Sequence, residues 1–193
     1  MEKTLRERIR MFKRGHIHKR SIELNSYPVD DGIILEGILY DERFVDIYDI
    51  DGSIKNKGPV HHISALILIR GMPPVIEDAE AEFLHYPHEL CPQAREGMKS
   101  LVGLEIRSGF GEKVHKIIGG KKGCAHLSHL IIVMGHVAMH GLWTSLLRER
   151  PSIPSSLEDI KALDYLIDSC FLWKEDGPFL KRLRSLVEDG QRG

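Results

Sequence analysis

The hydrophobic pattern of this chain changes from a period of two to a helical period near Cys91-Pro92, and that change constrains the fold more than any other feature. Before this point apolar and polar residues alternate, which is typical of strands with one buried face. After it the apolar residues follow a helical spacing, and Pro92 suits the first turn of a helix. Strands followed by helices predict an α+β fold.

The first part of the chain, residues 15–85, predicts an antiparallel sheet. Its strand candidates cover about residues 16–22, 33–40, 43–50, 61–70 and 75–83. The segments between them contain turn signals, namely Asp30-Asp31-Gly32, Asp51-Gly52 and Gly71-Met72-Pro73-Pro74. Short turns join neighbouring antiparallel strands, so we expect a meander of about five strands.

The second part, residues 91–190, predicts packed helices. We expect helices over 93–101, from about Cys124 to Arg148, from Ser155-Ser156 to Trp173 and over about 178–187, with a short segment around 114–118. Residues 2–14 predict a short charged helix or an arm. No linker or internal repeat divides the chain, so we expect a single domain over residues 1–193.

Charge and composition exclude several classes of protein. The 27 basic and 28 acidic residues give a net charge of -1, which provides no single-sign field for nucleic acid or an anionic membrane. The charged N-terminus is unlike a secretory signal, and the apolar run around 130–138 is too short to span a bilayer. Three cysteines without regular spacing argue against a disulfide framework. We therefore expect a cytoplasmic protein with reduced thiols.

Two of the cysteines lie where helices are expected to begin. Cys124 follows the glycine-rich segment that ends at Gly123, and Cys91 precedes Pro92. Unpaired N–H groups and the helix dipole at such a position favour the thiolate, which binds metals and attacks electrophiles. Alternatively, each cysteine is a small apolar residue packed under the sheet. Cys170 lies within an expected helix, and we expect it in the core.

His61 begins the fourth strand candidate, and the alternation places it on the buried face of that strand. If Cys91, Cys124 and His61 meet at one edge of the sheet, their thiolates and imidazole suit Zn²⁺ or an iron–sulfur centre. His62 or His126 could supply a fourth ligand, or the position could stay open. His61 could instead be a structural residue that makes hydrogen bonds.

Four histidines of the expected long helix form a stripe within about 80 degrees; they are His126, His129, His136 and His140. The stripe predicts a boundary that faces water or another subunit, so a homodimer or an unknown protein partner could bind there. A second metal site or a pH-responsive surface is the alternative. On an ideal helix Cys124 projects about 160 degrees away from His126. Both can bind one ion only if Cys124 lies in an unwound cap.

A further group of polar residues alternates along the first strand candidate. His16, His18 and Arg20 share one strand face and could bind an anion or a carboxylate. Alternatively this face is exposed, with Glu23 and Asp31 as partners of the basic side chains.

Several short motifs together resemble an uncharacterised bacterial family of domains of unknown function over about residues 16–140. They are His18-Lys19-Arg20, Asp31-Gly32, Glu36-Gly37, His61, Ile76-Glu77-Asp78-Ala79, Cys91, Leu101-Val102-Gly103 and Gly123-Cys124-Ala125-His126-Leu127. The chain departs from the family pattern at Ala125, His129 and His62, where Thr, Glu and Asp are expected. The resemblance implies boundaries and no reaction.

Residues 60–91 also resemble the central part of the U-type iron–sulfur assembly scaffolds. The shared order is a ligand before an apolar strand, a turn, the segment Ile76–Phe83 and then Cys91 at a helix start. Gly123-Cys124 resembles the last scaffold cysteine, and His61 or His62 stands where the first one would be. The resemblance implies a scaffold-like fold and metal binding. The histidine at the position of the first cysteine differs from the ligand set of the scaffolds, which argues against cluster assembly.

The leading hypothesis from the sequence is therefore a protein that binds Zn²⁺ or an iron–sulfur species through His61, Cys91 and Cys124. One alternative is a thiol-dependent enzyme with Cys124 as the nucleophile and His61 or His126 as the base. The other is a non-catalytic structural or interaction domain whose cysteines are simply buried.

Overall fold

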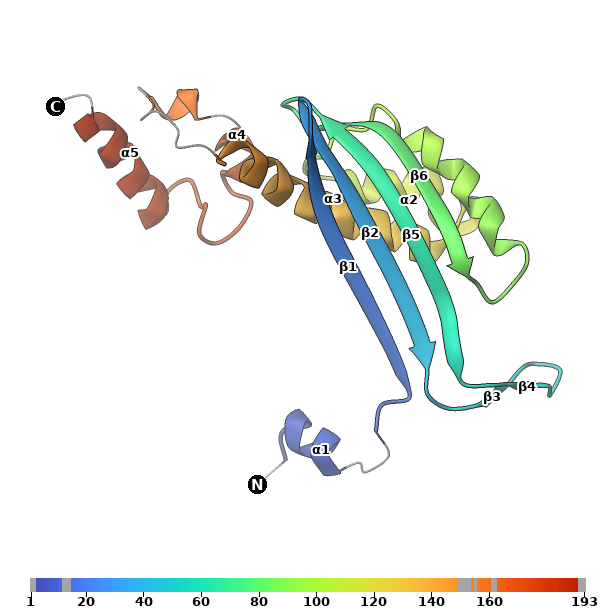
Figure 1. Cartoon of the computed structure of the whole chain (residues 1–193). Coiled ribbons are helices and arrows are strands. Elements are labelled where there is room, and N and C mark those ends of the chain that lie inside the picture. Colours follow the sequence, from blue (N-terminus) through green and yellow to red (C-terminus); the bar gives the residue numbers. More distant parts are fainter. Residues whose placement is uncertain (1–2, 12–14, 149–153, 155, 161–162, 191–193) are drawn as a thin grey trace.

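A four-stranded antiparallel sheet forms the centre of the computed structural model, which describes residues 3–11, 15–148, 154, 156–160 and 163–190. The strand order is β1-β2-β5-β6, and the strands span His18–Val29, Gly32–Arg43, Gly58–Arg70 and Val75–His85 (Figure 1). Each long strand pairs with the next one along the chain. The predicted α+β fold and antiparallel meander are confirmed, with four strands in the sheet instead of five.

The predicted strand over residues 43–50 is wrong. β2 continues to Arg43, and the chain then leaves the sheet and forms a separate small ribbon of β3 (Ile47–Tyr48) and β4 (Ile54–Lys55). The predicted Asp51-Gly52 turn closes this ribbon, and Gly52 has a φ of 82°, which suits glycine. The apolar side chains of the ribbon face solvent, so strand-like composition did not lead to pairing with the sheet.

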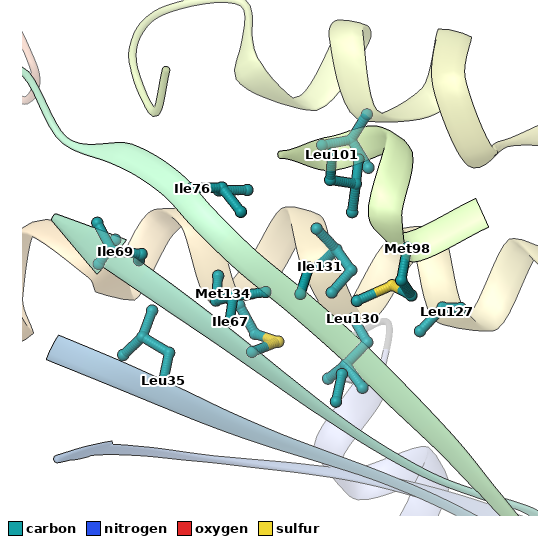
Figure 2. Packing of buried hydrophobic residues seen from close by; sticks show 14 of the residues in the cluster. Leu35, Ile67, Ile69, Ile76, Met98, Leu101, Leu127, Leu130, Ile131 and Met134 are labelled. Carbon is teal, nitrogen blue, oxygen red and sulfur yellow. The ribbon is translucent and has the colours of Figure 1, made fainter. Parts of the chain in front are cut away.

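Helices cover one face of the sheet. They are the 3-10 helix η1 (Cys91–Leu101), α2 (Phe110–Ile118), the short η2 (Gly120–Lys122) and α3 (Ala125–Leu146) (Figure 1). α3 crosses β2 at Gly37, where a Cβ would lie 2.7 Å from Sδ of Met134, so this close approach requires glycine. Apolar side chains of the sheet, η1 and α3 interdigitate to form the core (Figure 2).

α3 is the central element of this helical layer. By length and composition alone it could cross a membrane, and within the described chain it alone passes that test. Half of that apolar window is buried inside the protein, and a single helix of this kind is weak evidence for a membrane span. Its observed bounds agree closely with the helix predicted from about Cys124 to Arg148.

The remaining helices lie outside this core. α1 (Leu5–Met11) is exposed throughout, and α4 (Leu163–Leu166) and α5 (Pro178–Gly190) lie beyond the C-terminal end of α3 (Figure 1). The continuous helix predicted up to Trp173 is wrong. Its predicted start at Ser155 lies outside the described residues, and the segment instead forms η3 (Leu157–Asp159), α4 and a series of turns. Cys170 lies in these turns and is exposed, contrary to its predicted burial.

Candidate metal centre

Three charged or titratable side chains lie in register across neighbouring strands. Arg20 of β1 pairs with Asp41 of β2, and Asp41 pairs with His61 of β5. In β2, Asp41 follows the buried residues Leu35 and Leu39 with a period of two, so its side chain points toward the helices. Asp41 is only 1% exposed, which makes it a carboxylate at the end of an apolar sheet face.

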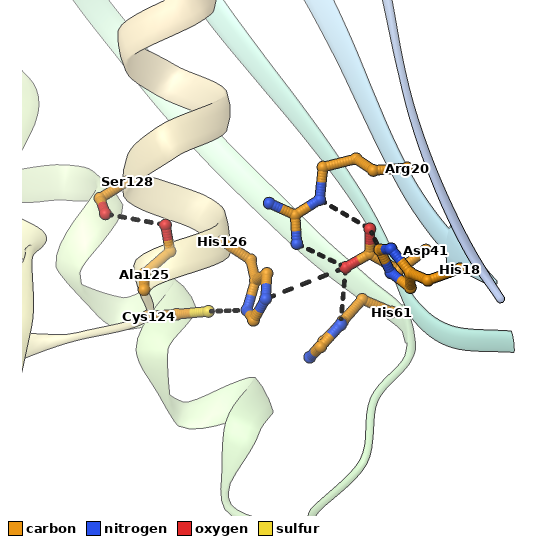
Figure 3. Close-up of polar contacts among 8 residues, drawn as sticks. All are labelled: His18, Arg20, Asp41, His61, Cys124, Ala125, His126 and Ser128. Atoms are coloured by element: carbon orange, nitrogen blue, oxygen red, sulfur yellow. Dashed lines mark hydrogen bonds and ion pairs between the residues drawn. The ribbon is translucent and has the colours of Figure 1, made fainter. Parts of the chain in front are cut away.

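Asp41 receives hydrogen bonds from both of its neighbours in the row. Arg20 binds it in a bidentate manner, with Nε 2.6 Å from Oδ1 and one Nη 2.6 Å from Oδ2. Nδ1 of His61 lies 3.0 Å from Oδ2, and Nε2 of His18 lies 3.6 Å from Oδ1 (Figure 3). A buried carboxylate is costly without partners, and here the partners supply both charge and hydrogen bonds.

The balance of these effects sets the pKa of Asp41. Burial acts to raise the pKa of this carboxyl, but the hydrogen bonds and charges of Arg20 and His61 outweigh it and lower the pKa below the ordinary value. Asp41 is therefore a carboxylate at neutral pH and offers oxygen lone pairs to a cation.

His126 approaches the row from the first turn of α3. Its ring lies against that of His61, with centroids 3.7 Å apart, and its Nε2 is 3.9 Å from Oδ2 of Asp41. Burial lowers the pKa of His126, and the nearby His61 and Arg20 charges add to this effect, while Asp41 opposes it. His126 is accordingly neutral at pH 7, the state in which imidazole binds metals.

Cys124 is the N-cap residue of α3 and lies outside the regular helix. Its φ of -103° and ψ of 127° are extended, and this unwound position places Sγ 3.8 Å from Nδ1 of His126. The separation of about 160 degrees expected on an ideal helix does not apply to such a cap. Cys124 thus lies next to the group formed by Asp41, His61 and His126 (Figure 3).

The predicted ligand set therefore requires a correction. Across the described parts of the chain, one group of histidine, cysteine or acidic residues brings three ligand atoms within 4.8 Å of one another, and it consists of Asp41, His61 and His126. Cys91, Cys124 and His61 do not form the expected cysteine-rich cluster. Cys91 and Cys124 instead line an open pocket next to it.

His62 is not brought to this group. As the residue after His61, it points to the opposite face of the sheet, where its ring contacts that of Tyr40 at 5.5 Å between centroids. His129, His136 and His140 are exposed on α3, so the four histidines of the predicted stripe do not share one site.

The sequence interpretation missed Asp41, the residue on which the group is built. A signal was present, because Asp41 continues the alternation of Ile33, Leu35 and Leu39, and a carboxylate in a buried register needs a partner. The suggestion that the first strand binds a carboxylate through Arg20 agrees with the structure. That carboxylate is Asp41, and neither Glu23 nor Asp31 takes this role.

Fold and site together define an α+β domain with an Arg–Asp–His row, built on a buried carboxylate, beneath the N-terminus of its central helix. The chain belongs to the DUF2889 family of proteins of unknown function, whose model matches residues 18–140. This range contains every residue of the row and of the group around it, and the resemblance to an uncharacterised family is confirmed. The searches of curated proteins and of solved structures found no match to the chain.

Proposed function

We propose that the chain binds a divalent transition-metal ion of the Zn²⁺ class through Asp41, His61 and His126. The observation that carries this proposal is the convergence of one carboxylate and two imidazoles within 4.8 Å. Carboxylate oxygen and imidazole nitrogen are the donors of many zinc sites, and three protein ligands leave a fourth position open. Sγ of Cys124 lies 3.8 Å from Nδ1 of His126, whereas Nε2 of that ring faces Asp41, so Cys124 is not counted among the ligands.

The distances support one shared ion after a small adjustment. Two donors at 2.0–2.1 Å from a tetrahedral zinc lie about 3.3 Å apart. The 3.0 Å between Oδ2 of Asp41 and Nδ1 of His61 is close to this value, and the ion would replace the proton that Nδ1 donates to Asp41. The 3.9 Å to Nε2 of His126 must shorten by about 0.6 Å. His126 is the most exposed of the three side chains, at 30%, so we expect its ring to make this change.

In this proposal Arg20 orients one of the metal ligands and does not itself bind the ion. Its bidentate contact fixes the orientation of the Asp41 carboxylate, as outer-shell partners of metal ligands commonly do. The positive charge of Arg20 also repels a cation, so we expect moderate affinity. Iron–sulfur clusters are usually held by several thiolates, so the nitrogen and oxygen donors of this group favour zinc.

The decisive experiment is elemental analysis of the purified full-length protein together with zinc titration against a chromogenic chelator. We expect about one equivalent of metal in the wild type. Replacement of His126 by Gln should weaken zinc binding by at least about tenfold, because one of three ligands is removed. His129→Gln is the matched control, since His129 is exposed on the same helix.

Metal-free wild-type protein that also fails to bind added zinc would contradict the proposal. Equal zinc affinity of the wild type and His126→Gln would contradict the assignment of the ligands. A second control, His62→Gln, changes the neighbour of a ligand on the opposite face of the sheet and should leave affinity unchanged.

Thiol chemistry at Cys124 is the second candidate function, and the contact between Cys124 and His126 favours it. A thiol 3.8 Å from a neutral imidazole can transfer its proton to that ring. Asp41, on the other side of the ring, then stabilises the imidazolium. This arrangement corresponds to the predicted thiol-dependent enzyme, with His126 as the base.

The cytoplasmic location and the absence of membrane and nucleic-acid partners remain predictions from the sequence. A homodimer through the exposed histidines of α3 also remains a prediction. Sedimentation of the purified protein at several concentrations tests it directly.

A further inference from the structure

We infer that the open face of the sheet is an interface on which α1 of a second copy of this chain docks. The helices that the structure describes cover one face of the sheet and leave the other face open (Figure 1). The proposed metal ligands of the sheet lie on the covered face, so this inference does not depend on whether a metal binds.

Three neighbouring rows of the open face contain apolar and acidic side chains and no basic one. The strand register gives the rows Tyr27, Ile34, Leu68 and Asp78; Asn25, Glu36, Leu66 and Glu80; and Glu23, Ile38, Ser64 and Glu82. The apolar residues of β2 and β5 in these rows are half-buried, and the acidic residues of β1 and β6 are exposed. The face therefore carries an apolar stripe along β2 and β5, broken by Glu36 and Ser64, with carboxylates on both edges.

Most of the carboxylates at the edges of this face have no cation beside them. Asp78 forms an ion pair with Lys99 at 2.6 Å. Within the described parts of the chain, no lysine or arginine pairs with Glu23, Glu80 or Glu82. The net charge of the whole chain is only -1, so the open face has a local excess of negative charge that attracts a basic partner.

α1 is a helix whose apolar side is uncovered. Its start is specified by a capping box, in which the Thr4 N–H donates to Oε2 of Glu7 at 2.8 Å and the Glu7 N–H donates to Oγ1 of Thr4 at 3.3 Å. Leu5 and Ile9, one turn apart, form an apolar ridge and are 75% and 73% exposed. A helix of seven residues is too short to be stable alone in water, so α1 needs a surface to pack against.

The charges of α1 match those of the open face. At about 100 degrees per residue, Arg6 and Arg10 flank one side of the apolar ridge and Arg8 flanks the other. β1 and β6 are three strand spacings apart, or about 14 Å, and a helix with its side chains is about 10–12 Å wide. A helix that lies along β2 and β5 thus places its ridge on the apolar stripe and its arginines near the carboxylates on both edges.

The position of α1 favours docking on a second copy. Residues 12–17 join α1 to β1, and such a short tether would strongly favour docking within one chain if the geometry allowed it. In the structure, however, α1 lies beyond the beginning of β1 and away from its own open face (Figure 1). The basic helix α5 is not an equivalent candidate, because it buries Leu180 and Val187 within its own chain.

Reciprocal exchange of α1 between two copies gives a dimer with two-fold symmetry. Each contact involves a short helix and is therefore small, so we expect a weak dimer that dissociates on dilution.

Charge reversal on each side of the contact tests this inference. Sedimentation equilibrium of the full-length protein, with a chelator present to prevent bridging by metal, measures dimerisation. Arg6→Glu with Arg10→Glu, and separately Glu80→Lys with Glu82→Lys, should each weaken the dimer at least about tenfold, because like charges then face each other. Added salt should weaken the wild-type dimer.

An equimolar mixture of these two double variants should recover most of the lost affinity. In the mixed dimer each acidic helix meets a basic face and each basic helix meets an acidic face, and only contacts between chains can restore association in this way. Two control pairs change exposed charges elsewhere by the same amount and should leave the dimer unchanged; they are Arg182→Glu with Arg184→Glu on α5, and Glu96→Lys with Glu112→Lys on η1 and α2. Far-UV circular dichroism confirms that each variant is folded.

A wild type that stays monomeric at all concentrations, as expected if α1 docks on its own chain, would overturn the inference. A dimer that survives both charge reversals, as expected for association through the histidines of α3, would overturn it as well. The same holds for a mixture that stays monomeric, or for control pairs that weaken the dimer equally. None of these results depends on zinc, so the metal site and the dimer can fail separately.

Discussion

At the residue scale, the site is built on one buried carboxylate whose partners come from three other elements. Arg20 on β1, His61 on β5 and His126 on α3 all face Asp41. A charge of this kind is tolerated in the core only while its partners remain in place. The same group thus stabilises this end of the sheet and supplies the proposed ligands, and substitutions can separate these two roles.

Removal of the Arg20 guanidinium should destabilise the protein. Arg20→Gln leaves Asp41 buried without its cation, and we expect a decrease of about 2 kcal/mol in the free energy of unfolding. This is less than for a fully buried pair, because the Arg20 side chain is 35% exposed and solvent screens part of the interaction. Urea denaturation at neutral pH measures the change.

Lys19→Gln is the control for Arg20→Gln. Lys19 is the preceding residue of β1 and points to the other face of the sheet, so we expect a change within about 0.5 kcal/mol. The double variant Arg20→Met with Asp41→Leu should lose less stability than the sum of its single variants, since no unpaired charge remains. Additive losses would show that the two residues are not coupled.

The lowered pKa of His126 should make the stability of the metal-free protein depend on pH. Between the folded-state pKa and the ordinary value of 6.5, the unfolded chain binds more protons than the folded one. Stability should therefore fall as the pH decreases from about 7.5 to about 5.5, and His126→Gln should reduce this slope. Urea denaturation across this range, with a chelator present, measures both slopes. An equal slope in the wild type and His126→Gln, or an equal effect of His129→Gln, would contradict the assignment.

At the element scale, α3 determines where the site forms. Its N-terminal end carries Cys124 and His126 over the row, and its middle packs against the sheet at Gly37 and against α2 at Gly135. Small residues at both crossings allow the backbones to approach closely. The position of the His126 ring above Asp41 therefore depends on packing well away from the site.

Gly135→Ala should disturb this packing. A Cβ at Gly135 would lie 2.5 Å from Cδ1 of Phe110, closer than carbon atoms can approach, and we expect a loss of about 1–3 kcal/mol. Gly111→Ala in α2 is the matched control, because its Cβ would make an ordinary contact at 3.4 Å with Ile132. This variant should be neutral or more stable by up to about 1 kcal/mol, as alanine favours helix. Urea denaturation that ranked the two variants in the opposite order would contradict the crossing described for Gly135.

The sequence was most informative where local chemistry decides the structure. Alternation predicted β2 and placed His61 on the buried face of its strand. The glycine and proline signals predicted that helices begin at Cys91 and Cys124. The association of Asp41 with His126 could not be predicted, because it depends on strand register and on the path of α3 across the sheet. The segment after Arg43 was misassigned for a similar reason. Its composition suits a strand, but it pairs within its own small ribbon and not with a strand of the main sheet.

At the scale of the whole molecule, the sheet and its covering helices form a core that the outer segments do not share. The family match over residues 18–140 contains all of the long strands and most of α3. By contrast, α1 contributes no buried residue, and β3 and β4 pair only with each other. Local stability should therefore differ strongly between the core and these segments.

Hydrogen exchange followed by mass spectrometry should reveal this division. Amides of β2, β5 and the middle of α3 can exchange only through extensive unfolding, because their hydrogen bonds lie in the sheet and under the apolar core. Amides of α1 and of the β3–β4 ribbon should exchange faster by several orders of magnitude, since they open without exposing core residues. Addition of zinc should slow exchange at the start of α3 and at the ends of β2 and β5, and should leave α1 unchanged. Slow exchange in α1 would contradict this division, because it would show that the helix is protected by packing against the rest of the protein.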